Sequence, residues 1–149
     1  MKEVFSEIDI QAPAERVWQV LTDFARYPEW NPFIRRINGE PKEGARLRVY
    51  IEPPGAKGRT YRPKVLKAEP KHELRWLGRP LIPGLFDCDH IFTIGHIGSE
   101  RVRFVQREIV SGVLVASYAH DLEMKMRLGF EQMNQALKTR AEQVCAFNP

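Results

Sequence analysis

His90 and Glu108 are the two side chains whose types and spacing best support acid–base chemistry in this sequence. Each occupies an inward-facing position of a predicted strand. The two strands are neighbours, joined by a predicted two-residue turn at Gly98-Ser99. Counting back from that turn places position 90 nearly opposite position 107, so the imidazole and the carboxyl group should be near neighbours. Such a pair can act as general acid and base on a bound molecule. It can also anchor a ligand, or form a purely structural hydrogen-bonded pair.

Other kinds of site have weaker support. Cys88 and His90, in a C-x-H spacing, lie on the same face of one predicted strand, and Glu108 would lie opposite them. Together the three side chains could ligate a metal ion. The chain lacks a second Cys or His at the spacing of real zinc sites, so we predict no metal and no cofactor. It also contains no G-x-S-x-G nucleophile motif and no glycine-rich phosphate loop.

A larger set of aromatic, thioether and aliphatic residues would suit the wall of an apolar cavity. Ligand pockets are mostly apolar with a few fixed polar groups, and methionine adapts to irregular shapes. Ordinary core packing is the alternative for each residue, so the hypothesis concerns the set. Together with His90 and Glu108, the predicted ligand-binding residues are Trp30, Phe33, Tyr61, Trp76, Phe92, Phe104, Tyr118, Leu122, Met126 and Met133.

The element that must position these side chains is a long amphipathic helix, predicted over about residues 117–144. Its apolar residues recur at steps of three and four, which is the period of a helix. At 1.5 Å per residue such a helix is roughly 42 Å long and needs a broad surface to lie on. Gly129, near its middle, costs about 1 kcal/mol relative to alanine. It is either a glycine that the helix simply tolerates, or one explained by close packing or by room for a ligand.

The residues before this helix mostly alternate with period two, which indicates strands. Short turns join consecutive strands, so we predict one antiparallel meander. Pro63 cannot donate a ladder hydrogen bond and predicts a bulge or an edge site. The predicted strands are 4–10, 33–38, 45–52, 59–68, 73–78, 86–96 and 101–109, with two short helices at 14–21 and 24–30. One straight helix cannot seal a strongly curved seven-stranded sheet everywhere, so a cavity is expected between them.

Size and composition predict a single domain over residues 1–149. The net charge is +4, and the basic residues alternate with apolar ones instead of clustering with exposed aromatics, so we predict no nucleic-acid partner. The two cysteines are read as reduced thiols. The N-terminus has no apolar signal region, and no run approaches the ~18 apolar residues of a membrane span. We therefore expect a cytoplasmic protein without stable membrane insertion, as a monomer or weak homodimer.

Several stretches resemble the START/polyketide-cyclase superfamily, also called SRPBCC. The clearest is IQAPAERVWQVLTDFARYPEWNPFI at 10–34, followed by HIF at 90–92, REIVSG at 107–112 and GFEQMNQALKTRAE at 129–142. The resemblance covers nearly the whole chain and implies an α+β helix-grip fold, with the curved antiparallel sheet wrapped around the C-terminal helix. Gln106 stands where relatives often have histidine, so the resemblance implies no histidine pair.

The resemblance and the residues lead to one expected function with an alternative. We expect the protein to bind a small hydrophobic or amphipathic ligand, such as a lipid, polyketide or aromatic metabolite, between the sheet and the long helix. His90, Glu108 and Tyr61 would orient its polar end. The alternative is a polyketide cyclase or dehydratase that uses His90 and Glu108. A protein-interaction module is disfavoured because the outward strand positions are mostly charged, and loop 79–85 is a candidate lid.

Overall fold

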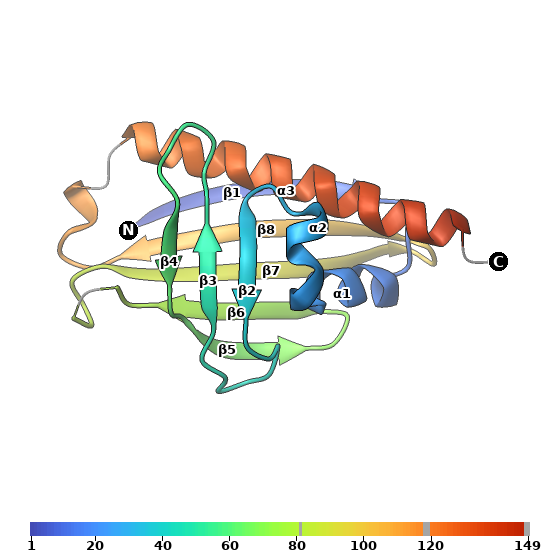
Figure 1. Cartoon of the computed structure of the whole chain (residues 1–149), viewed down its shortest axis with the longest axis horizontal. Helices are drawn as coiled ribbons and strands as arrows, with labels where there is room; N and C mark the ends of the chain where they lie inside the picture. The colour runs from blue at the N-terminus through green and yellow to red at the C-terminus, as the bar shows by residue number, and fades with distance from the viewer. Residues whose placement is uncertain (81, 118–119, 148–149) are drawn as a thin grey trace.

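The computed structural model describes residues 1–80, 82–117 and 120–147, with side chains up to residue 143. Within these residues the chain forms two antiparallel sheets and a long C-terminal helix (Figure 1). Its elements, in order, are β1 (Lys2–Ile10), α1 (Ala14–Thr22), η1 (Phe24–Arg26), α2 (Tyr27–Trp30), β2 (Ile34–Asn38), β3 (Arg48–Ile51), β4 (Arg59–Tyr61), β5 (Lys64–Glu69), β6 (Glu73–Gly78), β7 (Asp87–Gly98), β8 (Arg101–Ser111), η2 (Val115–Ser117) and α3 (His120–Phe147).

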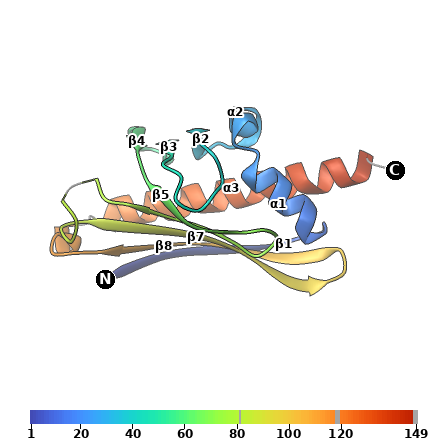
Figure 2. The ribbon, with the colours of Figure 1, turned by 90° about the horizontal axis from the view of Figure 1, so that it is seen from below.

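The larger sheet has the strand order β1-β8-β7-β6-β5, and the smaller sheet has the order β2-β3-β4. Figure 2 shows the larger sheet as the lower layer, with α3 and the smaller sheet over the same face. The strands of the smaller sheet cross those of the larger one steeply (Figure 1). The α+β helix-grip class predicted from the sequence is confirmed, and the arrangement leaves an inner space bounded by two sheets and a helix.

The predicted single strand over 59–68 is wrong, and Pro63 is the reason. β4 ends at Tyr61 and β5 begins at Lys64, because proline has no N–H to continue the ladder. The described residues therefore hold eight strands in two sheets instead of seven strands in one. Hydrogen bonds of the 44–47 segment, from Leu47 N to Pro63 O (2.8 Å) and from Val65 N to Ala45 O (2.8 Å), fix the corner.

The long helix has the predicted place and pattern. α3 packs mainly on β1 and on α1, and Phe130, Met133, Leu137 and Ala141 on its inner side are fully buried. Leu122, in the first turn, remains 38% exposed, so this end of the helix lies further from the main core. The apolar stripe thus supports close packing along most of the helix and looser packing at its N-terminal end.

Gly129 allows the closest approach between α3 and the rest of the core. A Cβ atom at this position would lie 2.3 Å from the ring of Phe33, which real structures do not tolerate. The ring of Phe33 also meets Phe130 edge to face, with 5.6 Å between centroids. Of the explanations for this glycine, the structure supports close packing.

We predict that Gly129→Ala destabilises the protein although alanine is the better helix former. The gain of about 1 kcal/mol in helix propensity is outweighed by overpacking against Phe33, which typically costs ~1–3 kcal/mol. Thermal unfolding followed by circular dichroism should show a lower midpoint, whereas Gln132→Ala, at an exposed position of the same helix, should change the midpoint little. A raised midpoint for Gly129→Ala would contradict the packing explanation.

Candidate functional site

His90 of β7 and Glu108 of β8 lie directly opposite each other in the larger sheet. The predicted neighbourhood is right, but the register differs by one residue. Gly98 pairs with Arg101, so the turn is Ser99-Glu100 instead of Gly98-Ser99, and a bulge lies between His96 and Gly98. The observed turn alone would place position 109 opposite His90, and the extra residue on β7 shifts the pairing back by one, to Glu108.

Both side chains are buried, with 2% of His90 and 6% of Glu108 exposed. His90 Nδ1 lies 3.7 Å from Glu108 Oε2, which is too long for a direct hydrogen bond. The imidazole stacks on Phe92 at 4.4 Å between centroids and also contacts the ring of Trp76 at 5.4 Å. The aromatic neighbours hold the ring plane, so the nitrogen atoms point in fixed directions.

A chain of hydrogen bonds determines which nitrogen of His90 carries the proton. Gln106 Nε2 donates to Asn134 Oδ1 at 2.9 Å, and Asn134 Nδ2 donates to Ser6 Oγ at 3.2 Å. Gln106 Oε1 is then an acceptor, so His90 Nε2, 2.9 Å away, must donate to it. His90 Nδ1 is left as an acceptor, buried and without a hydrogen-bond partner among the described residues, on the side of Glu108.

Burial shifts the pKa values of the two groups in opposite directions. It lowers the pKa of His90 to about 4, against smaller opposing effects of the Gln106 hydrogen bond and of Asp89. It raises the pKa of Glu108 to about 7, and the negative charge of Asp89 adds to this rise. Near neutral pH the imidazole is therefore neutral and the carboxyl group is partly protonated. A protonated Glu108 can donate a proton and His90 Nδ1 can accept one, which is the chemistry of an acid–base pair.

These two side chains form part of the wall of a cavity of about 400 Å³. The cavity lies between the β3–β4 hairpin and strands β6 to β8, and α3 contributes only Leu122 and Met126 to it. It is thus mainly a space between two sheets and less a space under the long helix. The other lining residues are Val49, Ile51, Pro53, Ala56, Lys57, Arg59, Tyr61, Pro63, Trp76, Gly78, Pro80, Phe86 and Cys88.

The structure places only half of the twelve predicted ligand-binding residues in the cavity wall. Tyr61, Trp76, His90, Glu108, Leu122 and Met126 lie in the cavity wall. Phe33, Phe92, Phe104 and Met133 do not, because they are fully buried in the packed core. Trp30 borders a separate surface depression with Arg16 and Arg140. Tyr118 lies outside the described residues.

Sequence reasoning missed the contribution of the β3–β4 hairpin. The segment around Pro53 and Ala56 reads as a flexible loop, yet it forms one wall of the cavity. Strand alternation did carry a signal, because Val49 and Ile51 of β3 pair with Tyr61 and Arg59 of β4 on one inward face. Only the crossing of the two sheets, which the sequence did not reveal, turns that face toward His90.

A family model described as polyketide cyclase / dehydrase and lipid transport matches residues 1–142. The chain belongs to this family. The resemblance seen in the sequence is thereby confirmed. No curated protein sequence matches the chain.

Solved structures show the same fold in members with different names. A START superfamily protein from Mycobacterium smegmatis has a TM-score of 0.74 at 21% identity, covering 95% of this chain and 98% of that one. The Zhui aromatase/cyclase from Streptomyces sp. R1128 has a TM-score of 0.77 at 18% identity, covering 97% and 95%. Norcoclaurine synthase from Thalictrum flavum has a TM-score of 0.69 at 12% identity, covering 97% and 96%. At these identities the likeness extends to the fold alone.

The described residues contain neither a membrane-spanning helix nor a cluster of metal ligands. No described helix is long and apolar enough to cross a membrane. Among the residues with defined positions, no three His, Cys, Asp or Glu side chains gather in a way that could hold a metal ion. Burial raises the pKa of the Cys88 thiol, so its sulfur is held as a neutral thiol in the cavity wall.

The raised pKa of Glu108 predicts a specific pH dependence of stability. The folded chain retains a proton at about pH 7 that the unfolded chain releases near the ordinary pKa of 4.5. This contribution to stability is complete below about pH 4.5 and is lost as the pH rises through about 7. Glu108→Gln removes this contribution. Between about pH 5 and about pH 8, the unfolding free energy of the variant should therefore rise by about 2.5 kcal/mol relative to that of wild type.

Urea unfolding at these two pH values measures the change. The opposite contribution of His90, whose lowered pKa reduces stability as the pH falls, is present in both proteins and cancels in the difference. A difference between the two proteins that is the same at both pH values would show that Glu108 titrates normally.

Proposed function

We propose that the protein binds a small, mostly apolar molecule in the cavity between its two sheets. The observation that supports this most is a space of about 400 Å³, within the range of ligand pockets, whose wall is mostly apolar. Its buried polar side chains are His90 and Glu108. Burial of apolar ligand surface contributes about 25 cal/mol per Å² and would supply most of the affinity.

The buried side chains of His90 and Glu108 could form hydrogen bonds with an uncharged polar group of the ligand. A protonated Glu108 can donate a hydrogen bond, and His90 Nδ1, which lacks a partner among the described residues, can accept one. Burial also raises the pKa of Tyr61, so its phenol stays neutral and can either donate or accept a hydrogen bond. A ligand hydroxyl group could donate to His90 Nδ1 and so satisfy an acceptor that is otherwise buried at a cost. A ligand carbonyl group could accept only from a protonated Glu108 or from the Tyr61 hydroxyl.

The account predicts that filling the cavity abolishes binding. Cys88 is half-buried in the cavity wall, and Cys88→Trp would occupy the space with an indole ring, whereas Cys88→Ser keeps the size. We expect the fluorescence of the uncharged dye phenylnaphthylamine to rise with wild type and Cys88→Ser, and to stay at background with Cys88→Trp. Circular dichroism checks that the variants fold.

Native mass spectrometry of the freshly purified wild type gives a second readout of the same prediction. A co-purified molecule, retained by Cys88→Ser and lost from Cys88→Trp, would support the proposal. Equal dye binding by the tryptophan variant would place the dye elsewhere and contradict it.

A second candidate function is catalysis of the cyclase or dehydratase type. The observation that favours it is a neutral imidazole acceptor beside a carboxyl group with a pKa of about 7, both facing the same cavity. One structural neighbour is named as an aromatase/cyclase. General acid–base catalysis needs this pairing of a donor and an acceptor near the working pH.

For this candidate we predict that the protein accelerates ring closure of a short linear poly-β-ketone thioester. Glu108→Gln and His90→Gln should each slow product formation by about 100-fold, because general acid–base groups typically contribute that much. Dye binding should persist in both variants. Equal product formation in the variants and wild type would exclude His90 and Glu108 as catalytic residues and leave the binding function.

A further inference from the structure

Two cations line the cavity, where strand alternation would favour apolar side chains. Arg59 of β4 pairs with Ile51, and Tyr61 pairs with Val49, so all four share one inward face. Val49 and Ile51 are buried, and Tyr61 is half-buried. Arg59 continues this row as an exposed residue of the cavity wall, and Lys57 follows it in the hairpin loop. The outer part of an otherwise apolar wall therefore carries two positive charges.

Neither cation has an acidic partner among the residues that the structure describes. The outer face of the larger sheet is different, because its arginines pair with acids. Arg75 lies 2.5 Å from Asp89, and Arg103 lies 2.8 Å from Asp9. The charges of Lys57 and Arg59 are thus available to a bound group.

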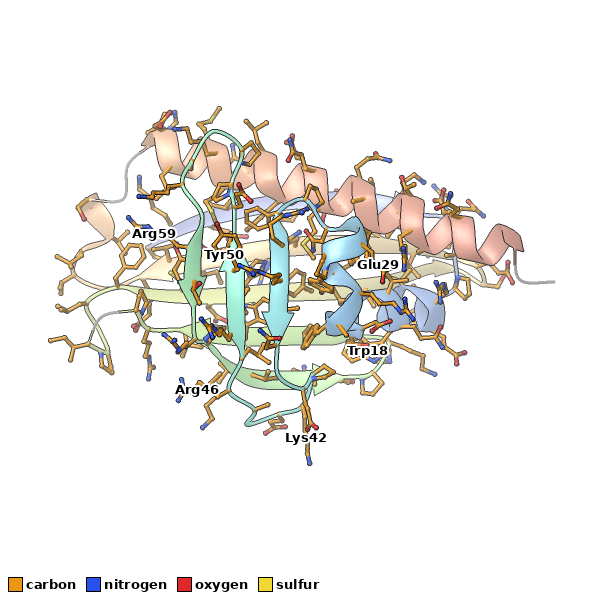
Figure 3. The ribbon with its side chains drawn as sticks, viewed as in Figure 1. Trp18, Glu29, Lys42, Arg46, Tyr50 and Arg59 are labelled. Atoms are coloured by element: carbon orange, nitrogen blue, oxygen red, sulfur yellow. The ribbon has the colours of Figure 1, made fainter. Side chains whose placement is uncertain are left out.

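The surrounding surface increases the positive potential. Residues 35–64 contain nine Lys and Arg against three Glu, a net charge of +6. The whole chain has +4, so the remainder is net negative. None of these nine cations forms an ion pair in the described part of the chain. Figure 3 shows Arg59 beside β4, whereas Lys42 and Arg46 lie at the opposite, lower end of the smaller sheet. Such a field attracts anions toward the cavity opening.

The hairpin that carries the two cations is held in place. A Cβ atom at Gly58 would lie 2.2 Å from the hydroxyl oxygen of Tyr50, so the Tyr50 side chain closes tightly over the loop. Ala56 N donates to Pro53 O at 3.0 Å and closes the turn before Lys57. The position of the cations relative to the cavity therefore depends on packing and not on a free loop.

The inner end of the cavity, at His90 and Glu108, disfavours a negative charge on the ligand. Glu108 is buried there, and a ligand anion beside it would add a second negative charge to a site with little solvent. His90 Nδ1, on the same side, is an acceptor and offers no proton to an anion. An anionic group is disfavoured at the inner end and favoured at the cationic rim, which sets a direction for the ligand.

We propose that the ligand is an amphipathic organic acid, whose apolar body fills the cavity and whose anionic group binds Lys57 and Arg59 at the rim. Its uncharged polar group, where present, lies at the His90–Glu108 end. This inference rests on the proposed binding function and deepens it by giving the charge and orientation of the ligand.

Two dyes with the same ring system test the inference. Anilinonaphthalene sulfonate carries one negative charge, and phenylnaphthylamine has the same rings without the sulfonate. We expect wild type to bind the sulfonate about tenfold more tightly than the neutral dye, which corresponds to the ~1.4 kcal/mol expected for contacts with two partly exposed cations. The preference should shrink as salt is added, because screening weakens exposed charges.

Lys57→Ala/Arg59→Ala should remove the preference for the sulfonate, measured as the ratio of the dissociation constants of the two dyes in the same variant. The matched control is Lys42→Ala/Arg48→Ala, which removes the same charge from exposed residues of the same basic segment outside the cavity wall. The control should keep most of the preference. Equal losses in both double variants would mean general attraction by the basic surface and would overturn the assignment to Lys57 and Arg59.

The outcomes separate this inference from the function on which it rests. If the neutral dye binds and the sulfonate binds no better, the inference is wrong and the binding function stands. If neither dye binds, or if Cys88→Trp binds both as well as wild type does, the inference and the proposed binding in this cavity are both wrong.

Discussion

The architecture depends on a break in backbone hydrogen bonding at Pro63. An unbroken strand over residues 59–69 would keep the β3–β4 hairpin in the plane of the larger sheet. Proline cannot donate to the ladder, so β4 leaves the direction of β5, and hydrogen bonds from the 44–47 segment hold the corner. The smaller sheet is thereby carried across the face of the larger one (Figure 2). The cavity and the cations that line it lie at this crossing.

The second determinant is the energy of polar groups inside an apolar core. His90, Gln106 and Asn134 are all buried, and their hydrogen bonds to one another and to Ser6 offset the cost of removing them from water. The chain of bonds leaves His90 Nδ1 without a partner among the described residues. Burial then keeps His90 neutral and shifts Glu108 toward its protonated form. The polar side chains of the inner wall are therefore more stable in their uncharged forms. The same site could then bind a neutral polar group of a ligand or transfer a proton to it.

Local patterns predicted the elements well and their arrangement only in part. The correct predictions include the apolar steps of the long helix, the alternation in β7 and β8, and the proximity of His90 to Glu108. All of them depend on neighbours close in sequence or across one hairpin. The residues assigned to the cavity wall were less well predicted, because Phe92, Phe104 and Met133 are apolar in the same way as Met126 and Leu122. Which of them face a space depends on where α1, α3 and the smaller sheet fill the interior, and that is a property of the crossing at Pro63. The one-residue shift at the Ser99-Glu100 turn likewise depends on a bulge that periodicity does not show.

The central claim, that a small molecule occupies the space between the two sheets, can be tested directly by amide chemical-shift mapping with phenylnaphthylamine added to isotope-labelled protein. The account predicts saturable shifts in the β3–β4 hairpin, in β6 to β8 around Trp76, Cys88 and Glu108, and in the first turns of α3. Residues near Leu137, far along the packed part of the helix, should remain unchanged. Shifts confined to other surfaces, or none at concentrations where the dye fluoresces, would contradict the account.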